Sequence, residues 1–157
     1  MWCSLITNLD YLPGLLTLQY SLQKVASKYP LVALYTDGFP EEGHKALDVR
    51  GIAKRRVVYV KPTGQKEYSN DPRFYDTWTK LTVFGLLEYD RAVLLDGDML
   101  VVRNMDELMD LPLDPVSANG KGQRVFAASP ACACNPANKP HYPKDWSVLA
   151  AFELSVS

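Results

Sequence analysis

Short apolar segments alternate with helix-like segments in the first part of the chain, and this alternation most constrains the fold. Residues 2–7, 31–36 and 55–60 have the length and composition of strands. A helix is predicted before Pro30 and a second over residues 41–49. The apolar positions at helical spacing in the first helix are Leu15, Leu18, Leu22 and Val25. This β-α-β-α-β order predicts an α/β protein with a mostly parallel sheet flanked by helices.

Further elements follow at less regular spacing. Residues 61–73 are polar and contain proline and glycine, which predicts a loop. Residues 74–88 predict a helix, residues 104–109 a short helix and residues 124–128 a strand. The apolar run over 92–95 predicts another strand, because four consecutive apolar residues fit a strand buried on both faces.

Length and composition fit one ordinary domain. The chain has 157 residues, of which 47% are hydrophobic and 22% charged, and its formal net charge is -1. A nearly neutral chain lacks the basic surface that nonspecific nucleic-acid binding requires. No apolar run is long enough to span a membrane, and no signal peptide is recognisable. We therefore expect a single domain over residues 1–157, atypical from about 147 to 157, in a cytoplasmic protein without nucleic-acid or membrane partners.

Two aspartates directly follow the apolar run over 92–95. We call Asp96, Gly97 and Asp98 the acidic turn. In open α/β sheets, ligands bind beyond the carboxyl ends of strands, and glycine lets the backbone come close to a ligand. Carboxylates at such a place favour a hard divalent cation, which prefers oxygen ligands and often bridges to phosphates. The acidic turn is therefore a candidate metal site, and a solvated turn is the ordinary alternative.

Two other functions of an acidic turn differ in their requirements. An EF-hand is excluded, because Leu100 and Val101 stand where that loop needs a ligand and a glycine. A phosphohydrolase with Asp96 as nucleophile and Asp98 as acid or base stays open as a remote alternative. It requires a downstream lysine and acidic pair, for which little chain remains.

A zinc site near the C-terminus is disfavoured. Cys132, Cys134 and His141 are only three local candidate ligands, and their C-x-C spacing is not the usual C-x-x-C. Cys3 would have to supply the fourth ligand from far away. Three cysteines also form no disulfide framework. We expect buried thiols in a structured loop.

Four residues outside the acidic turn have both a structural and a functional interpretation. Thr7 and Asn8 lie at the end of the first predicted strand. They are either turn and cap residues, or they lie beside the base and ribose of a bound nucleotide. Tyr11 follows on the first helical turn, where its ring could stack on a base. Lys80 lies on the predicted 74–88 helix; it is solvated there, or it neutralises a diphosphate beside the metal.

Several sequence blocks, in this order and spacing, resemble glycosyltransferase family 8, which includes glycogenin and galactinol synthase. The blocks are Leu5-Ile6-Thr7-Asn8 with Tyr11, Trp78-Thr79-Lys80-Leu81, Val93-Leu94-Leu95-Asp96-Gly97-Asp98, and Asn104-Met105-Asp106-Glu107-Leu108. The resemblance runs from about Leu5 to Trp146. Residues 126–129 and 142–146 are similar to the fungal and plant glycogenin-like branch.

The resemblance implies a GT-A fold, a Rossmann-like fold of nucleotide-diphospho-sugar transferases. It implies a retaining hexosyltransferase that uses a UDP-sugar and Mn²⁺ or Mg²⁺. By position, Asp96 and Asp98 would bind the metal as the D-x-D pair. The family's nucleotide-sugar contacts fall on Leu5, Thr7, Asn8, Tyr11, Lys80, Asp96, Gly97 and Asp98. The resemblance assigns no catalytic residue.

Later family motifs have no counterpart in this sequence: an Asn-Ser-Gly strand, an Asp-Gln pair and a late metal-binding histidine. His44 and His141 stand at other positions. We therefore expect a C-terminally truncated form with weak UDP–metal binding and little or no transfer. A non-catalytic nucleotide-binding or interaction module is the alternative. An incomplete sheet edge would favour association with a second copy or with a full-length relative. The sugar (glucose, galactose or N-acetylglucosamine) and the acceptor stay open.

Overall fold

The computed structural model describes residues 1–61, 73–113 and 126–128. The chain divides into two units, Met1–Leu111 and Pro112–Ser157. All helices and strands among the described residues belong to the first unit. The expected tail over 147–157 lies outside the described residues. A single domain over residues 1–157 stays a prediction.

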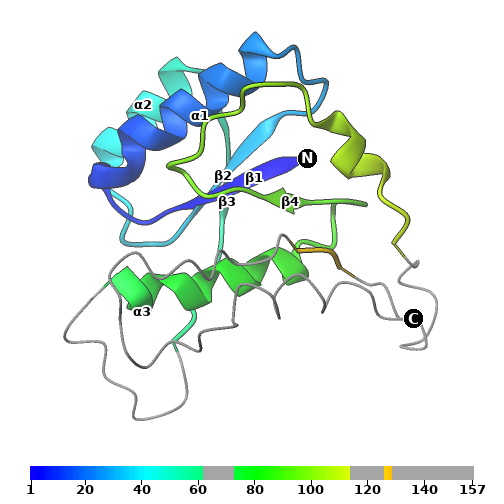
Figure 1. Ribbon diagram of the computed structural model, residues 1–157. Helices are drawn as coiled ribbons and strands as arrows, with labels where there is room; N and C mark the ends of the chain where they lie inside the picture. The colour runs from blue at the N-terminus through cyan, green and yellow to red at the C-terminus, as the bar shows by residue number, and fades with distance from the viewer. Residues whose placement is uncertain (62–72, 114–125, 129–157) are drawn as a thin grey trace, which may run out of the picture. The chain divides into compact units, whose positions relative to one another are not determined.

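Strands and helices alternate along the first unit (Figure 1). The elements, with η for 3-10 helices, are β1 (Trp2–Ile6), η1 (Leu9–Tyr11), α1 (Leu12–Lys24), β2 (Leu31–Tyr35), α2 (Glu41–Val49), β3 (Ala53–Arg56), α3 (Arg73–Thr77), η2 (Trp78–Gly85), β4 (Val93–Leu94) and η3 (Asp106–Asp110). The predicted β-α-β-α-β order of the first part is therefore confirmed.

The strands form one parallel sheet. Among the described residues its order is β3-β2-β1-β4, and every neighbouring pair is parallel. The register places Trp2 of β1 opposite Leu31 of β2 and Val93 of β4. A parallel sheet with helical crossovers is the α/β architecture that the sequence predicts. The carboxyl ends of β1 and β4 consequently meet at the same edge of the sheet.

Helices cover both faces of this sheet (Figure 1). On the face of α1 and α2, the buried cluster includes Trp2 and Ile6 of β1 together with Leu15 and Leu18 of α1. On the opposite face, the buried residues Cys3, Val32 and Leu34 pack with Leu86, which follows η2. Because side chains alternate along a strand, β1 and β2 contribute to both clusters. These strands are therefore buried on both sides.

A side-chain cap in the turn after β1 stabilises the start of η1, which continues directly into α1. The Asn8 side-chain oxygen accepts a hydrogen bond of 3.0 Å from the Asp10 backbone N–H. Asn8 therefore caps η1, which satisfies one of the donors that a helix start leaves unpaired. Pro13 follows in the first turn of α1, where its missing N–H costs nothing.

The third strand differs from its prediction. The sequence predicts residues 55–60, whereas β3 spans Ala53–Arg56. A last ladder bond joins the Val57 N–H to the Tyr35 carbonyl at 2.8 Å, and β2 ends at Tyr35. Beyond that point β2 offers no partner. The chain turns instead toward the 73–85 helix, where the Val60 N–H donates to Thr79 Oγ1 at 3.2 Å.

The predicted helix over 74–88 is shorter and tighter than expected. α3 continues directly into the 3-10 helix η2, which ends at Gly85. Threonine and valine are frequent in this stretch, and β-branched residues lower α-helix propensity. Thr82 Oγ1 also donates to the Thr79 carbonyl at 2.7 Å, a side-chain bond that competes with regular helix geometry.

The strand before the acidic turn is also shorter than expected. β4 comprises only Val93 and Leu94, both half-buried, and it is an edge strand of the described sheet. Full burial on both faces was therefore the wrong prediction. The ladder continues for one further bond, from the Leu95 N–H to the Cys3 carbonyl at 2.8 Å.

Two predicted elements near the end of the described chain had different outcomes. The short helix predicted over 104–109 exists as η3, and Asn104 Oδ1 accepts from the Asp106 N–H at 2.8 Å. The strand predicted over 124–128 does not appear at residues 126–128, and its other residues lie outside the described ones. No helix in the described part of the chain has both the length and the apolar character of a membrane span.

Candidate functional site

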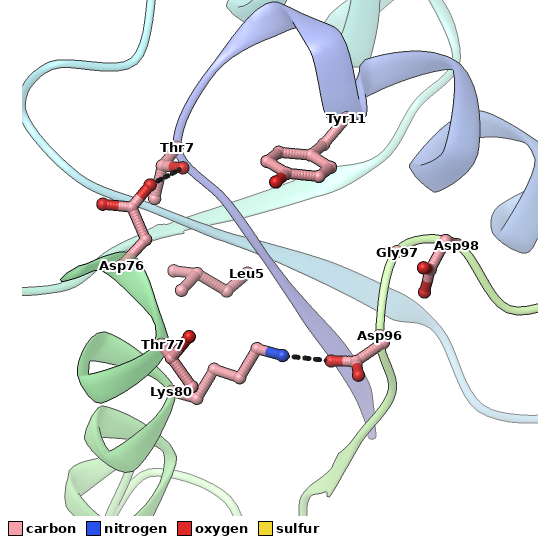
Figure 2. A pocket seen from close by; sticks show the side chains of 9 residues that line it. All are labelled: Leu5, Thr7, Tyr11, Asp76, Thr77, Lys80, Asp96, Gly97 and Asp98. Atoms are coloured by element: carbon pink, nitrogen blue, oxygen red, sulfur yellow. Dashed lines mark hydrogen bonds and ion pairs between the residues drawn. The ribbon is translucent and has the colours of Figure 1, made fainter. Parts of the chain in front are cut away.

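A pocket opens at the carboxyl ends of β1 and β4 (Figure 2). It is lined by Leu5, Thr7, Tyr11, Asp76, Thr77, Lys80, Asp96, Gly97 and Asp98. Every site residue predicted from the sequence is in this set except Asn8. They come from β1 and the residue that follows it, from η1, from η2 and from the acidic turn, so the parallel sheet gathers residues that are far apart in the sequence. The position beyond the strand ends is typical of ligand sites in open α/β sheets.

The acidic turn and Lys80 form one end of the pocket. Figure 2 shows the Lys80 ammonium reaching across from η2 to the Asp96 carboxylate, with which it forms an ion pair. The pair is solvent-accessible, with 36% of the Lys80 side chain and 48% of the Asp96 side chain exposed. Asp98 is exposed as well. Exposed ion pairs are weak, so a competing cation can displace Lys80 from Asp96.

The backbone of the acidic turn is held by close contact with α1. A Cβ built on Gly14 would lie 2.6 Å from the Gly97 carbonyl oxygen and 3.6 Å from Asp98 Cα. Only glycine permits this approach, which explains a residue of low helix propensity in the first turn of α1. On the other side, a Cβ on Gly97 would lie 3.6 Å from Ser4 Oγ. The backbone of the acidic turn therefore packs closely between α1 and β1.

Further along, the chain after the acidic turn is tied to the other end of α1. The Val101 N–H donates to Ser21 Oγ at 3.1 Å, and Asn104 Nδ2 donates to the Val25 carbonyl at 3.1 Å. Asp106 accepts from Ser27 Oγ at 2.6 Å and from the Lys28 N–H at 2.9 Å. These bonds lower the pKa of Asp106, with the Ser27 hydrogen bond as the largest cause. The chain segment that carries the aspartates is thus anchored on α1 and the turn that follows it.

At the other end of the pocket, Asp76 organises two hydroxyl groups. Its carboxylate accepts from Thr7 Oγ1 at 2.7 Å and from the Tyr59 hydroxyl at 3.0 Å. We call Thr7, Tyr59 and Asp76 the Asp76 network. Burial, followed by the hydrogen bond to Asp76, raises the pKa of the Tyr59 hydroxyl. The network joins the end of β1 and the segment after β3 to α3.

Sequence reasoning missed Asp76 and Thr77 as pocket residues. A signal was present, because Asp76 and Lys80 are four residues apart on a predicted helix and such residues share one helix face. Placing Lys80 at the site therefore implied Asp76 beside it. Tyr59 carried no comparable signal, because the sequence assigned it to the interior of a strand.

Asn8, His44 and Cys3 are not among the residues that line the pocket. The Asn8 side chain is occupied as the cap of η1, so its predicted nucleotide contact stays a prediction. His44 packs edge-on against the rings of Tyr35 and Phe39, at centroid distances of 4.6 and 5.0 Å. Cys3 is buried within the sheet, and burial raises the pKa of its thiol to about 12. The predictions on Cys132, Cys134 and His141 lie outside the described residues.

The donor set fits a hard cation in part. Asp96 and Asp98 supply oxygen ligands of the type that Mg²⁺ and Mn²⁺ prefer. Among the residues that the structure describes, no group of three or more His, Cys, Asp or Glu side chains is arranged to hold a metal. Two carboxylates suit a metal that keeps several waters and shares phosphate oxygens with its substrate.

The fold and the pocket define the class of the protein: an α/β protein with an acidic ligand pocket at the carboxyl ends of its parallel strands. Comparison with known families agrees, since the model of "Glycosyl transferase family 8" matches residues 2–144. The chain belongs to glycosyltransferase family 8. The parallel sheet with its flanking helices is consistent with the Rossmann-like GT-A fold predicted for this family.

Individual relatives match about two thirds of the chain. Galactinol synthase 1 of Arabidopsis thaliana is 34% identical over 105 residues, which are 67% of this chain and 30% of that protein. Galactinol synthase 2 of Solanum lycopersicum is 33% identical over 105 residues, 67% of this chain and 31% of that protein. Uncharacterized protein R707 of Acanthamoeba polyphaga mimivirus is 37% identical over 104 residues, 66% of this chain and 37% of that protein. The matched part therefore spans about a third of these relatives.

Proposed function

We propose that the pocket is the donor site of a glycosyltransferase that transfers a hexosyl group from a UDP-sugar to an acceptor. The transfer would retain anomeric configuration and use Mn²⁺ or Mg²⁺ at Asp96 and Asp98. The observation that carries this proposal is the convergence of the two aspartates, Lys80, Tyr11 and Thr7 on one pocket of a family 8 chain.

Charge balance supports a metal together with a diphosphate. Among the described residues that line the pocket, Asp76, Asp96 and Asp98 are acidic and Lys80 alone is basic. A diphosphate alone would be repelled by this excess of negative charge. When bound, the cation supplies Lewis-acid stabilisation to the diphosphate leaving group. Lys80, released from Asp96, would then neutralise the diphosphate from η2.

The remaining pocket residues suit a nucleoside. The ring of Tyr11 faces the pocket in Figure 2 and is 41% exposed, which leaves one face for stacking on a base. Leu5 also lines the pocket and supplies an apolar contact. A flat aromatic base and a charged diphosphate would thus meet complementary surfaces within one pocket.

Metal and nucleotide are expected to bind together. Two protein carboxylates hold a divalent cation weakly, and the diphosphate supplies further oxygen ligands. Transfer additionally requires a positioned acceptor and groups that stabilise charge in the transition state. We expect the chain of 157 residues to bind UDP weakly with the metal and to transfer little sugar by itself.

Calorimetry with UDP and Mn²⁺ tests this proposal. Wild type should bind Mn²⁺ alone weakly and should bind UDP only when Mn²⁺ is present. Asp98→Ala should weaken UDP binding with Mn²⁺ at least about tenfold, because a metal-bound charge is lost. Asp110→Ala, at an exposed aspartate of η3 outside the pocket, is the matched control and should bind as wild type does. No heat with wild type, or unchanged heat with Asp98→Ala, would contradict the proposal.

Turnover assays separate the alternative functions. Metal-dependent hydrolysis or transfer of a UDP-sugar supports the enzyme, whereas UDP binding without turnover supports a nucleotide-binding module. Release of phosphate from a generic phosphoester, without any UDP-sugar, would instead indicate the phosphohydrolase built on Asp96 and Asp98.

A further inference from the structure

Asp76 determines the hydrogen-bonding character of its end of the pocket. An ionised carboxylate accepts hydrogen bonds and has none to donate. The Thr7 and Tyr59 hydroxyls therefore direct their hydrogens toward it, at 2.7 and 3.0 Å. Each hydroxyl has a single hydrogen, so neither has one left for a ligand. What Thr7 and Asp76 present to the pocket is lone pairs.

The two ends of the pocket consequently select different parts of a ligand. At the acidic turn, Lys80 and a divalent cation favour phosphate. At the Asp76 network, a carboxylate without a basic partner among the described contacts disfavours phosphate and favours a neutral N–H or O–H donor. Figure 2 shows Thr7 and Asp76 at one side of the pocket and the Lys80–Asp96 pair at the other. A nucleoside diphosphate would thus be oriented with its nucleoside at Asp76.

The geometry points to Asp76 as a specificity-determining residue that, with Thr7, accepts a hydrogen bond from a donor group of the nucleoside. This inference rests on the proposed function of the same pocket. Uridine has two kinds of donor, the N3–H of its base and the hydroxyls of its ribose. Asp76 acts directly through its remaining lone pairs and indirectly by fixing Thr7 Oγ1 as an acceptor.

The test compares UDP with analogues that lack one donor. Binding of UDP, N3-methyl-UDP, 2′-deoxy-UDP and 3′-deoxy-UDP is measured by calorimetry with Mn²⁺, on wild type and on Asp76→Asn. Wild type should bind at least one analogue about tenfold more weakly than UDP, as expected for a lost hydrogen bond that leaves a polar group unpaired. The weakened analogue identifies the donor as base or ribose.

Asp76→Asn should reduce this discrimination to less than about threefold. Asparagine keeps the size of the side chain but brings its own hydrogens, so a neighbouring hydroxyl must accept from it and turns its own hydrogen outward. Steric effects of an added methyl group remain the same in both proteins. Only the hydrogen-bonding part of the discrimination therefore changes.

Thr7 supplies a second pair of variants. Thr7→Ser keeps the hydroxyl and should keep the discrimination, whereas Thr7→Val has the same shape without the hydroxyl and should lose part of it. Asp10→Asn removes a negative charge from η1 outside the pocket and should change nothing. Thermal unfolding identifies any variant that fails to fold. If Asp76→Asn does not fold, the comparison of Thr7→Ser with Thr7→Val tests the inference instead.

The outcomes separate this inference from the proposed function. If wild type binds no UDP with Mn²⁺, both are overturned. If wild type binds UDP and all analogues equally, or if Asp76→Asn and Thr7→Val discriminate as wild type does, only the role of Asp76 is overturned. Discrimination that falls in Asp76→Asn and Thr7→Val and survives in Thr7→Ser and Asp10→Asn supports it.

Discussion

The two ends of the pocket differ in how firmly their polar groups are held. At the acidic turn, both aspartates are exposed, and the Asp96 carboxylate pairs with the solvent-accessible ammonium of Lys80. At the Asp76 network, three half-buried side chains from separate segments are joined by two hydrogen bonds. The acidic turn therefore suits a small cation that can replace Lys80 as the partner of Asp96. The second is preorganised, as recognition of a larger rigid group requires.

The two ends of the pocket also differ in which part of the chain, backbone or side chains, is held in place. The acidic turn has loose side chains on a backbone that is fixed by α1 and β1 through Gly14 and Gly97. The Asp76 network has fixed side chains that themselves join α3 to the sheet. A change of backbone packing should therefore damage the acidic turn most, and a change of side chain should damage the Asp76 network most.

Gly14→Ala should have the largest effect. The new Cβ would lie 2.6 Å from the Gly97 carbonyl oxygen, a backbone atom that cannot move without displacing Asp98. We expect metal-dependent UDP binding to fall more than about tenfold and the free energy of unfolding to fall by about 1–3 kcal/mol. Calorimetry and urea denaturation measure the two effects.

The matched control for this change is Gly38→Ala, because a Cβ there would meet nothing within 4 Å. That variant should bind UDP as wild type does. If Gly14→Ala also bound normally, the fixed backbone of the acidic turn would be irrelevant to its function.

Lys80→Met should have a smaller effect, and it should weaken nucleotide binding without weakening metal binding. It removes the ammonium from Asp96 and leaves a chain of similar length, so Mn²⁺ alone should bind as well as in wild type or better. UDP binding with Mn²⁺ should weaken about tenfold, because one charge-assisted hydrogen bond to the diphosphate is lost.

A surface lysine outside the pocket serves as control for this variant. Lys54 pairs with Asp48 at 2.6 Å, and Lys54→Met should change neither measurement. Parallel losses of Mn²⁺ and UDP binding in Lys80→Met would mean that Lys80 supports the fold of the pocket and does not exchange between partners.

Asn8→Ala should have the smallest effect on binding and a clear effect on stability. The side chain caps η1, and loss of a helix cap costs about 1 kcal/mol. UDP affinity should change less than threefold, since Asn8 does not line the pocket. Asn8→Asp, which keeps the accepting oxygen, should restore the stability measured by urea denaturation. A large loss of UDP affinity with normal stability would instead support the nucleotide contact that the family resemblance implies.

Local sequence signals succeeded where the physical cause is itself local. The alternation of residues 2–49 predicted β1, α1, β2 and α2, because apolar periodicity reflects which face of each element is buried. The aspartates after the apolar run were predicted at a strand end, and the parallel sheet then brought them beside Thr7 and Tyr11. The general rule that ligand sites lie beyond the carboxyl ends of parallel strands was enough to place these aspartates.

Signals failed where a neighbour decides the outcome. Residues 57–60 have the composition of a strand, but β2 ends at Tyr35 and offers no strand partner beyond its bond to Val57. The apolar run over 92–95 predicted a strand buried on both faces, whereas β4 is a half-buried edge strand of the described sheet. No property of a single segment could reveal either result.

The sequence by itself determined the α/β class, the family and the position of Asp96 and Asp98 after a strand, because these follow from periodicity and from short contiguous motifs. Only the tertiary structure decided that Gly14 holds the acidic turn and that Asp76 directs the hydrogens of Thr7 and Tyr59. Both depend on distances between segments distant in the chain. Such distances are set by packing, and no local pattern records them.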